Sequence, residues 1–248
     1  MIPCKVKEPQ FFSHSRLYRW THWRQYLAQF PTAGGTEPID LNWFVLDKDG
    51  NLSTEKVSYG RNLSGREMTG EASANTFSQV PPRRLRHSFA DARLILLLRN
   101  PTERAYSHYR MFERFKKEGR RLPFALTNFD EDARCEMDAF VSGRRTYFIG
   151  LGVYHTRLKI WLDEFGKQRV HVIFTENLES PDDASKELNL LCQFLDIEPY
   201  DFSGILDMKF NTSPPIEMPH SVRADLDYFY QEHNAILENL LNVKLPWK

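Results

Sequence analysis

The chain has 248 residues, with 33 basic and 33 acidic side chains and a formal net charge of zero at pH 7. This length allows one sizeable core, and no bulk positive charge recruits a long polyanion, so nucleic-acid binding is not indicated. Cys4, Cys135 and Cys192 lie far apart, which indicates neither a zinc site nor a dense disulfide framework. One disulfide and three buried thiols both stay open. No apolar run approaches the roughly 18 residues that cross a bilayer, and the first residues lack the apolar stretch of a signal peptide.

The first part of the chain carries the weaker structural signals. Residues 11–30 are rich in aromatic side chains at helix-compatible spacing, including Trp23, Tyr26 and Phe30. Residues 31–69 contain the turn-rich stretches "PTAGGTEP" and "LDKDGNLSTE". This composition predicts an irregular or hairpin-bearing insertion over residues 31–69.

A strand followed directly by a helix is predicted in "RLILLLRNPTERAYSHY", residues 93–109. The run of leucine and isoleucine predicts a strand that is buried on both faces and ends at Arg99. Asn100 is typical of a helix N-cap, and Pro101 is typical of the first helical position, where no N–H is needed. Residues 122–143 predict a surface loop with a short helix.

The periodicity becomes regular from Gly152 onwards. Apolar spacing predicts a helix from Tyr154 that stops at Gly166, and "RVHVIFTENL" predicts a second buried strand. Further amphipathic helices are predicted over 183–196 and 221–241, the last with an apolar face of Val222, Leu226, Phe229, Ile236 and Leu240. Strands alternating with helices predict one α/β domain over 1–248, with a central parallel sheet covered by helices on both faces.

The end of the predicted strand is a candidate anion site. Open α/β sheets bind ligands at the carboxyl ends of their strands, and a helix N-terminus favours negative charge. Arg99 adds a planar fork suited to two oxygens of a phosphate or sulfate, and Ser107 lies on the same helix face as Arg104. The alternative is that Arg99 pairs with a neighbouring carboxylate and Ser107 only packs. Spacing alone leaves both open.

The pattern R-N-P-x-x-R-x-x-S-x-Y after a buried strand resembles the segment of sulfotransferases that binds the 3′-phosphate of 3′-phosphoadenosine 5′-phosphosulfate (PAPS). The resemblance extends over nearly the whole chain. "KEPQFF" (7–12) and "GEASANTF" (70–77) are similar to segments of carbohydrate sulfotransferases, and so are residues 152–181 and the closing "FYQEHNAILENLLNVKLPW". It implies a three-layer sulfotransferase fold like that of P-loop NTPases, with PAPS as co-substrate and no metal.

Roles for individual residues follow from this resemblance. Glu8 would be the general base, because a carboxylate next to Phe11 and Phe12 is partly desolvated and its pKa rises. Its alternative role is a surface ion pair with Lys5 or Lys7. Arg99 and Ser107 would bind the 3′-phosphate of the donor. Lys7 and Glu71 are implied on the acceptor side, and further nucleotide contacts are implied for Tyr154, Lys209, Asn211 and Thr212.

The chain also departs from the family. Ala72 stands where heparan sulfate enzymes carry a lysine, and no Lys-x-Gly-Thr-Thr loop for the 5′-phosphosulfate appears in the sequence. That loop would precede "KEPQFF", so we expect the first βα unit to be missing, through truncation or through degeneration. The functional alternative is therefore an inactive homologue that binds nucleotide or glycan. An unrelated P-loop kinase is disfavoured, because its G-x-x-x-x-G-K-[ST] motif is absent.

The acceptor is expected to be a carbohydrate or a related small molecule with a hydroxyl group. Its identity, the oligomeric state and the compartment stay open. A eukaryotic fragment would belong in the Golgi lumen, and a bacterial protein in the cytoplasm.

Overall fold

The structure is a computed structural model that describes residues 2–3, 11–13, 20–30, 39–46, 52–59, 68–206 and 217–247. The chain divides into two compact units, Met1–Leu85 and Arg86–Lys248, and each is described by itself. The prediction of a single domain over residues 1–248 stays a prediction.

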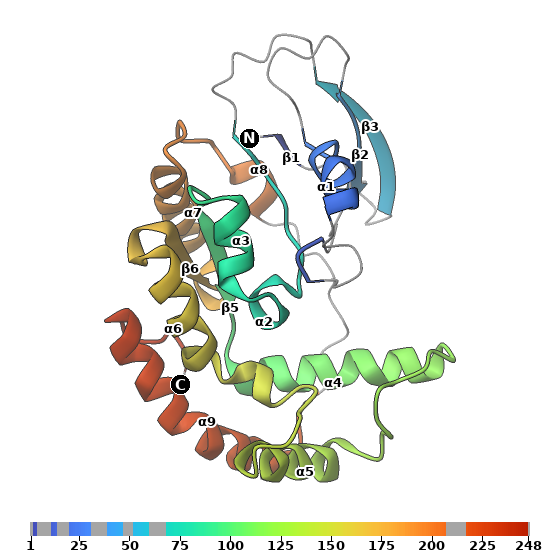
Figure 1. The fold of residues 1–248 in the computed structure, drawn as a ribbon. Helices are drawn as coiled ribbons and strands as arrows, with labels where there is room; N and C mark the ends of the chain where they lie inside the picture. The colour runs from blue at the N-terminus through green and yellow to red at the C-terminus, as the bar shows by residue number, and fades with distance from the viewer. Residues whose placement is uncertain are drawn as a thin grey trace. The chain divides into compact units, whose positions relative to one another are not determined.

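The first unit contains short pairs of strands and a few helices. Strand β1 (Ile2–Pro3) pairs in parallel with β4 (Thr69–Gly70), and β2 (Ile39–Leu46) pairs antiparallel with β3 (Leu52–Tyr59). The hairpin of β2 and β3, drawn in Figure 1, is the one allowed for in residues 31–69. The helices are α1 (Trp20–Leu27), α2 (Thr76–Gln79) and α3 (Pro82–Ser88), of which the last crosses into the second unit.

Aromatic side chains form the best-defined core of this first unit. Phe11 and Phe12 are both buried, and the Phe11 ring stacks on Tyr26 with centroids 4.4 Å apart. Trp23 and Phe30 contact the same Tyr26 ring. The spacing predicted for residues 11–30 therefore brings its aromatic residues together around Tyr26.

The second unit alternates helices with two parallel strands. Strands β5 (Leu94–Leu98) and β6 (Val170–Phe174) pair in parallel, with Leu94 opposite Val170 and Leu98 opposite Phe174. The α/β class and the parallel pairing of the predicted strands are thus confirmed. The helices, including three short 3-10 helices labelled η, are α4 (Pro101–Lys117), α5 (Phe129–Val141), η1 (Gly150–Gly152), α6 (Tyr154–Phe165), η2 (Lys167–Arg169), η3 (Thr175–Leu178), α7 (Pro181–Leu195), α8 (Ser203–Leu206) and α9 (His220–Leu241).

Strand β5 differs from its prediction in one respect. Ile95 and Leu97 are 40% and 55% exposed, whereas Leu98 is buried. Helices α6 and α7 both contact β6, and the alternation along β5 is that of a strand covered on one face. The expectation of burial on both faces is therefore wrong for β5 in the described part of the chain.

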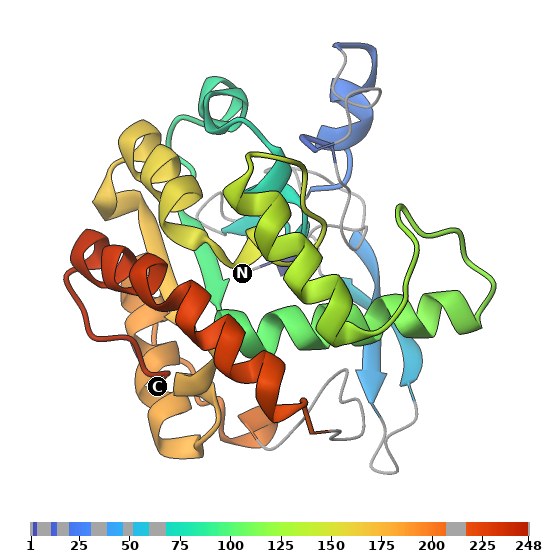
Figure 2. The same ribbon diagram turned by 90° about the horizontal axis from the view of Figure 1, so that it is seen from below.

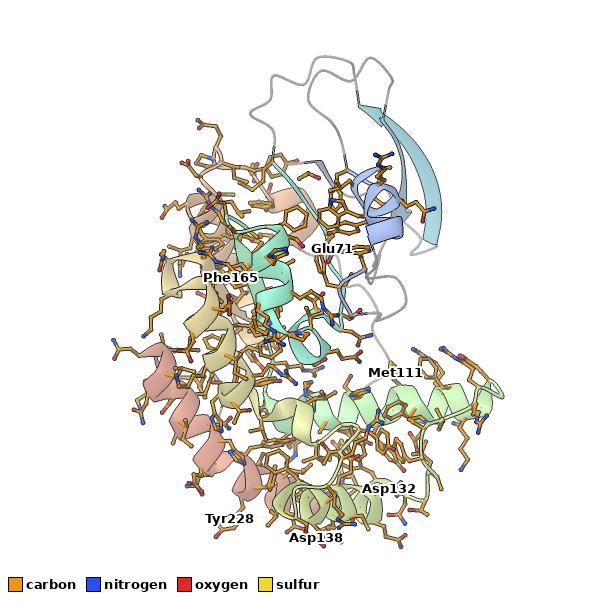
Figure 3. All side chains as sticks on the ribbon, in the orientation of Figure 1. Glu71, Met111, Asp132, Asp138, Phe165 and Tyr228 are labelled. Atoms are coloured by element: carbon orange, nitrogen blue, oxygen red, sulfur yellow. The ribbon has the colours of Figure 1, made fainter. Side chains whose placement is uncertain are left out.

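The main apolar core lies among α4, α5, η1 and α9. Figures 1 and 2 both show α5 and α9 beside α4, and contacts join α9 to each of the other two helices. In Figure 3 Asp132 is labelled on α5, and its carboxylate accepts a hydrogen bond of 2.8 Å from the Tyr109 hydroxyl of α4. Burial of these facing aromatic and aliphatic side chains stabilises the unit. The fully buried members are Ala105, Tyr109, Ala133, Phe148, Ile149, Val222, Leu226 and Tyr230.

The predicted end of α6 is confirmed, and the predicted face of α9 needs a correction. Helix α6 stops before Gly166, whose φ of +82° favours glycine. In α9 the buried residues are Val222, Leu226, Tyr230 and Leu237, whereas Ile236 is 40% exposed. Steps of four and seven residues keep this face on one side of the helix. None of the described helices is both long and apolar enough to span a membrane.

Candidate functional site

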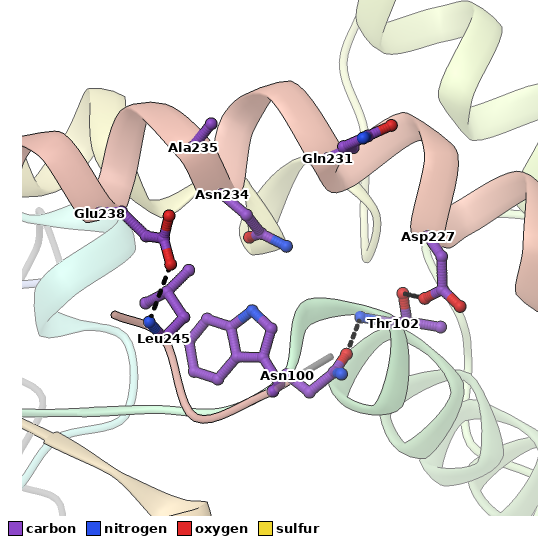
Figure 4. Close-up of a pocket in the computed structure, with 9 residues that line it drawn as sticks. Asn100, Thr102, Asp227, Gln231, Asn234, Ala235, Glu238 and Leu245 are labelled. Atoms are coloured by element: carbon purple, nitrogen blue, oxygen red, sulfur yellow. Dashed lines mark hydrogen bonds between the residues drawn. The ribbon is translucent and has the colours of Figure 1, made fainter. Parts of the chain in front are cut away.

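The junction between β5 and α4 is built as the sequence predicts. The Asn100 side-chain oxygen accepts hydrogen bonds from the backbone N–H groups of Thr102, at 2.9 Å, and Glu103, at 3.3 Å. Pro101 begins the helix, and Figure 4 shows the cap together with the Thr102 hydroxyl, which donates to Asp227 at 2.6 Å. The first free N–H groups of α4 are therefore used by the cap, so an anion here depends on side chains.

Two side chains at this junction are available for an anion. Arg99 and Ser107 are both exposed. In the part of the chain that the structure describes, neither side chain makes a hydrogen bond or an ion pair. The alternative in which Arg99 pairs with a neighbouring carboxylate is thus not seen among these residues. The structure gives no contact between Arg99 and Ser107.

The backbone that carries Arg99 is held from two sides. The Tyr154 hydroxyl, at the start of α6, donates a hydrogen bond of 2.9 Å to the Arg99 carbonyl. The next N–H, that of Asn100, donates at 2.7 Å to Glu176, which follows β6. Tyr154 is buried, which raises the pKa of its hydroxyl and keeps it neutral. Both contacts fix the position from which the Arg99 side chain extends.

Arg104 supports the segment in front of α6. Its guanidinium donates to the Phe148 carbonyl, and its Nη1 lies 3.4 Å from His108 Nδ1. Burial, and after it the nearby Arg104 charge, lower the pKa of His108 from 6.5 to about 4. A neutral His108 can accept from Arg104 through Nδ1. Arg104 therefore braces this segment through a backbone carbonyl.

Sequence reasoning missed Glu136, the residue that holds the backbone of residues 147–149 in place. Glu136, buried in α5, accepts hydrogen bonds from the N–H groups of Tyr147, Phe148 and Ile149, the last two at 2.9 and 2.8 Å. A buried carboxylate is tolerated only when such donors surround it. No sequence signal marks Glu136, because its donors are backbone groups eleven to thirteen positions away.

A close approach of three helices adjoins this segment at Gly152. A Cβ atom there would lie 2.8 Å from the Tyr230 hydroxyl oxygen and 2.9 Å from Pro101 Cβ. The Tyr230 hydroxyl itself donates at 2.7 Å to the Ile149 carbonyl. Residue 152 must therefore be glycine for α4, α9 and the start of α6 to meet.

In the first unit the structure describes one of the predicted acceptor-side residues. Glu71 is half-buried and accepts a hydrogen bond of 3.1 Å from the Ser73 hydroxyl. Burial raises the pKa of the Glu71 carboxyl, and the hydrogen bond from Ser73 partly opposes this. A raised pKa is a property of carboxyls that exchange protons in active sites.

The other predicted residues lie outside the described part of the chain. These are the base Glu8, the neighbouring Lys7, and the loop residues Lys209, Asn211 and Thr212. Phe11 and Phe12, which follow Glu8 in the sequence, are described and buried. Among the described residues no group of three or more histidines, cysteines or acids is arranged to hold a metal ion.

The strand ends, the capped helix and the exposed arginine define an α/β protein whose candidate site lies at the carboxyl end of its sheet. The sequence model of the sulfotransferase domain family matches residues 4–208, and the chain belongs to this family. The expectation from the motifs is thereby confirmed at the level of the family and of sulfuryl transfer.

The chain was also compared with solved structures. A sulfotransferase from Alicyclobacillus acidocaldarius is 23% identical and superimposes with a TM-score of 0.58, over 98% of this chain and 86% of that one. The sulfotransferase domain from the curacin biosynthetic pathway is 14% identical with a TM-score of 0.35, over 74% of this chain and 58% of that one. The first similarity supports the sulfotransferase fold. A comparison with curated proteins found no match.

Proposed function

We propose that this protein transfers a sulfuryl group from PAPS to a hydroxyl group of a carbohydrate or a related acceptor. Family membership supports the transfer of a sulfuryl group. The observation that carries the donor assignment is Arg99, exposed and unpaired among the described residues, at the carboxyl end of β5. A guanidinium held by its backbone at a strand end suits bidentate contact with a phosphate.

In this proposal Arg99 and Ser107 bind the 3′-phosphate of the donor. Tyr154 acts on the nucleotide site through the Arg99 carbonyl, to which it donates at 2.9 Å. Lys209, Asn211 and Thr212 are assigned to the loop that covers the nucleotide. These contacts orient the donor, because a positioned sulfuryl group needs less reorganisation to react.

Glu8 takes the proton from the acceptor hydroxyl. The acceptor oxygen forms a bond to sulfur while the bond between sulfur and the 5′-phosphate oxygen breaks, and 3′-phosphoadenosine 5′-phosphate leaves. Lys7 and Glu71 bind the acceptor. Burial of Phe11 and Phe12 supports the apolar surroundings assigned to Glu8, and the raised pKa of Glu71 supports a polar role next to the acceptor.

A second candidate is a homologue that binds nucleotide or glycan without transfer. The observation in its favour is that no Lys-x-Gly-Thr-Thr loop occurs in the 248 residues. In that case the 3′-phosphate contacts persist, but no group stabilises the charge on the leaving phosphate oxygen.

Calorimetric titration with 3′-phosphoadenosine 5′-phosphate tests the donor site. Arg99→Ala should weaken binding by about 10- to 100-fold, since it removes a charge-assisted contact, and Ser107→Ala by about fivefold. Arg93→Ala is the matched control, because Arg93 is exposed and precedes the same strand at its other end. Equal affinity of the Arg99→Ala and Arg93→Ala variants would remove the anion site from β5.

Transfer is tested with radiolabelled PAPS and a panel of sugar acceptors. Glu8→Gln should reduce turnover by at least about 100-fold while nucleotide affinity is unchanged, because a general base acts only on the chemical step. Glu118→Gln, at the exposed C-cap of α4, is the control. Nucleotide binding without transfer in the unchanged protein would favour the second candidate.

A further inference from the structure

A pocket lined by both polar and apolar groups lies beside the strand end, on the side of Asn100. It has a volume of about 290 Å³, near the lower end of pockets that hold small molecules. Figure 4 shows Asn100 at the start of α4, with Asp227, Asn234 and Glu238 on α9. Trp247 completes the lining, and we call this site the α9 pocket. Neither Arg99 nor Ser107 lines it.

Two hydrogen-bond donors of the α9 pocket lack acceptors. The Trp247 Nε1 atom is buried and has no partner among the described residues. Asn100 uses its side-chain oxygen to cap α4, and in the described part of the chain its NH₂ group has no acceptor. A buried donor without an acceptor costs about 1–3 kcal/mol, so an occupant that accepts hydrogen bonds is favoured.

The pocket also contains carboxylates that accept hydrogen bonds and an amide that can both donate and accept. Asp227 accepts one hydrogen bond from Thr102 and has further lone pairs. In Figure 4 the Asn234 amide points from α9 into the space between Asn100 and Glu238, and no hydrogen bond within the described residues uses it. Glu238 accepts from the Leu245 N–H at 3.0 Å and from Lys244 at 3.2 Å, which offsets part of its charge. The pocket therefore both donates and accepts.

This combination of groups discriminates among classes of ligand. An anion would approach the carboxylates of Asp227 and Glu238, and the described residues that line the pocket include no lysine or arginine. An ammonium ion has no acceptor for Trp247 or Asn100, and a hydrocarbon would leave every polar group unpaired. A hydroxyl group satisfies both kinds of partner, because it donates and accepts at once.

We propose that the α9 pocket binds a neutral polyhydroxyl compound of the size of one sugar ring. Hydroxyl groups of the ligand donate to Asp227 and accept from Trp247 and Asn100, while Asn234 does both. The site is separate from the contacts assigned to the donor phosphate, and its occupancy does not depend on sulfuryl transfer.

Saturation-transfer NMR and tryptophan fluorescence on the full chain test this proposal. The probes are glucose, galactose, mannose and N-acetylglucosamine, titrated through the millimolar range. At least one sugar should bind, and Asn234→Ala should weaken its binding about fivefold, the effect of one lost hydrogen bond. Asn239→Ala is the matched control, because Asn239 is exposed on the same helix and does not line the pocket. It should leave the affinity unchanged.

Two further variants keep the proposal open to refutation if Asn234→Ala fails to fold. Trp247→Phe keeps a ring beside Phe174 but removes the Nε1–H, so the sugar-dependent fluorescence change should disappear. Gln231→Ala alters an exposed lining residue and should weaken binding about threefold. The proposal is overturned if no sugar of the panel binds, if binding is unchanged in these variants, or if sulfate or ethylammonium displaces the sugar.

Discussion

Two strand-to-helix junctions of the second unit have similar local sequences but different tertiary contacts. In the first junction β5 leads through Arg99 and Asn100 to α4, and in the second junction β6 leads through η3 and Ser180 to α7. Each helix has a polar N-cap that accepts from a backbone N–H, and each has proline in its first turn. Local sequence alone therefore does not separate them.

The difference lies in what holds each junction. In the first, Tyr154, Glu176 and Asp227 reach the junction from 55 to 125 positions away. In the second, the Ser180 hydroxyl donates to Asp183 at 2.9 Å, and Lys186 pairs with the same carboxylate. Asp182 and Asp183 also occupy the positive end of α7, whereas Arg99 precedes the start of α4. The first junction is thus held by side chains distant in the sequence, and the second by its own neighbours.

The largest expected effect on stability concerns Glu136, which holds the segment that Arg104 of α4 contacts. Glu136→Gln should lower the free energy of unfolding by about 2–3 kcal/mol, because an amide cannot accept from three N–H groups as the carboxylate does. Urea unfolding measures this, with Glu131→Gln, exposed on the same helix, as the control. If the two variants were equally stable, the hydrogen bonds to Tyr147, Phe148 and Ile149 would not support the junction.

A pH-dependent effect of about 2 kcal/mol is expected at His108. Its pKa is lowered from 6.5 to about 4 in the folded chain, mainly by burial and further by Arg104, so the unfolded chain binds the proton more tightly. Stability is thus complete above pH 6.5 and is lost as the pH falls towards 4. His108→Gln should flatten this part of the profile of urea midpoints against pH. His87→Gln, at an exposed histidine, is the control.

The two caps provide a direct comparison of the junctions. Asn100→Ala should cost about 2 kcal/mol, since two N–H groups lose their acceptor, and Ser180→Ala about 1 kcal/mol. Affinity for 3′-phosphoadenosine 5′-phosphate should fall in Asn100→Ala, because the backbone next to Arg99 is released, and should stay the same in Ser180→Ala. An equal loss of affinity in both would show that the first junction is not specifically held for binding.

The smallest effect is expected at Tyr154. Tyr154→Phe removes the hydroxyl that donates to the Arg99 carbonyl and should cost about 1 kcal/mol of stability. Nucleotide affinity should fall only about threefold, since the Arg99 side chain remains. Tyr200→Phe, at an exposed tyrosine, is the control for both measurements. A loss as large as that of Arg99→Ala would mean that Tyr154 contacts the nucleotide itself.

Sequence signals that act within a few residues predicted the second unit well. The helix start at Pro101 and the stop at Gly166 depend on caps and φ angles, which are properties of neighbouring residues. The helix in residues 122–143 was predicted to be short but runs over Phe129–Val141. Its Asn128 cap and acidic first turn are the local signals that indicate its length.

What the sequence could not supply was tertiary pairing. Glu136 and Asn234 look like ordinary helical residues, and their importance appears only with the backbone groups and the pocket around them. Glu176 is an intermediate case, because it follows a predicted strand. Parallel strands end at the same edge of a sheet, so the sequence could have predicted that Glu176 lies close to Asn100. The exposure of Ile95 and Leu97 depends on which elements cover β5, and a run of apolar residues does not predict this.

Gly152 has a consequence for how sequence variants of this protein are interpreted. Its missing side chain is what lets Pro101 and Tyr230 approach, so a methyl group there already collides with both. In a mutational library every substitution at this position should be depleted through lower abundance of folded protein. Inactive variants at position 152 would therefore report on folding yield, and an apparent hot spot there would carry no information about chemistry.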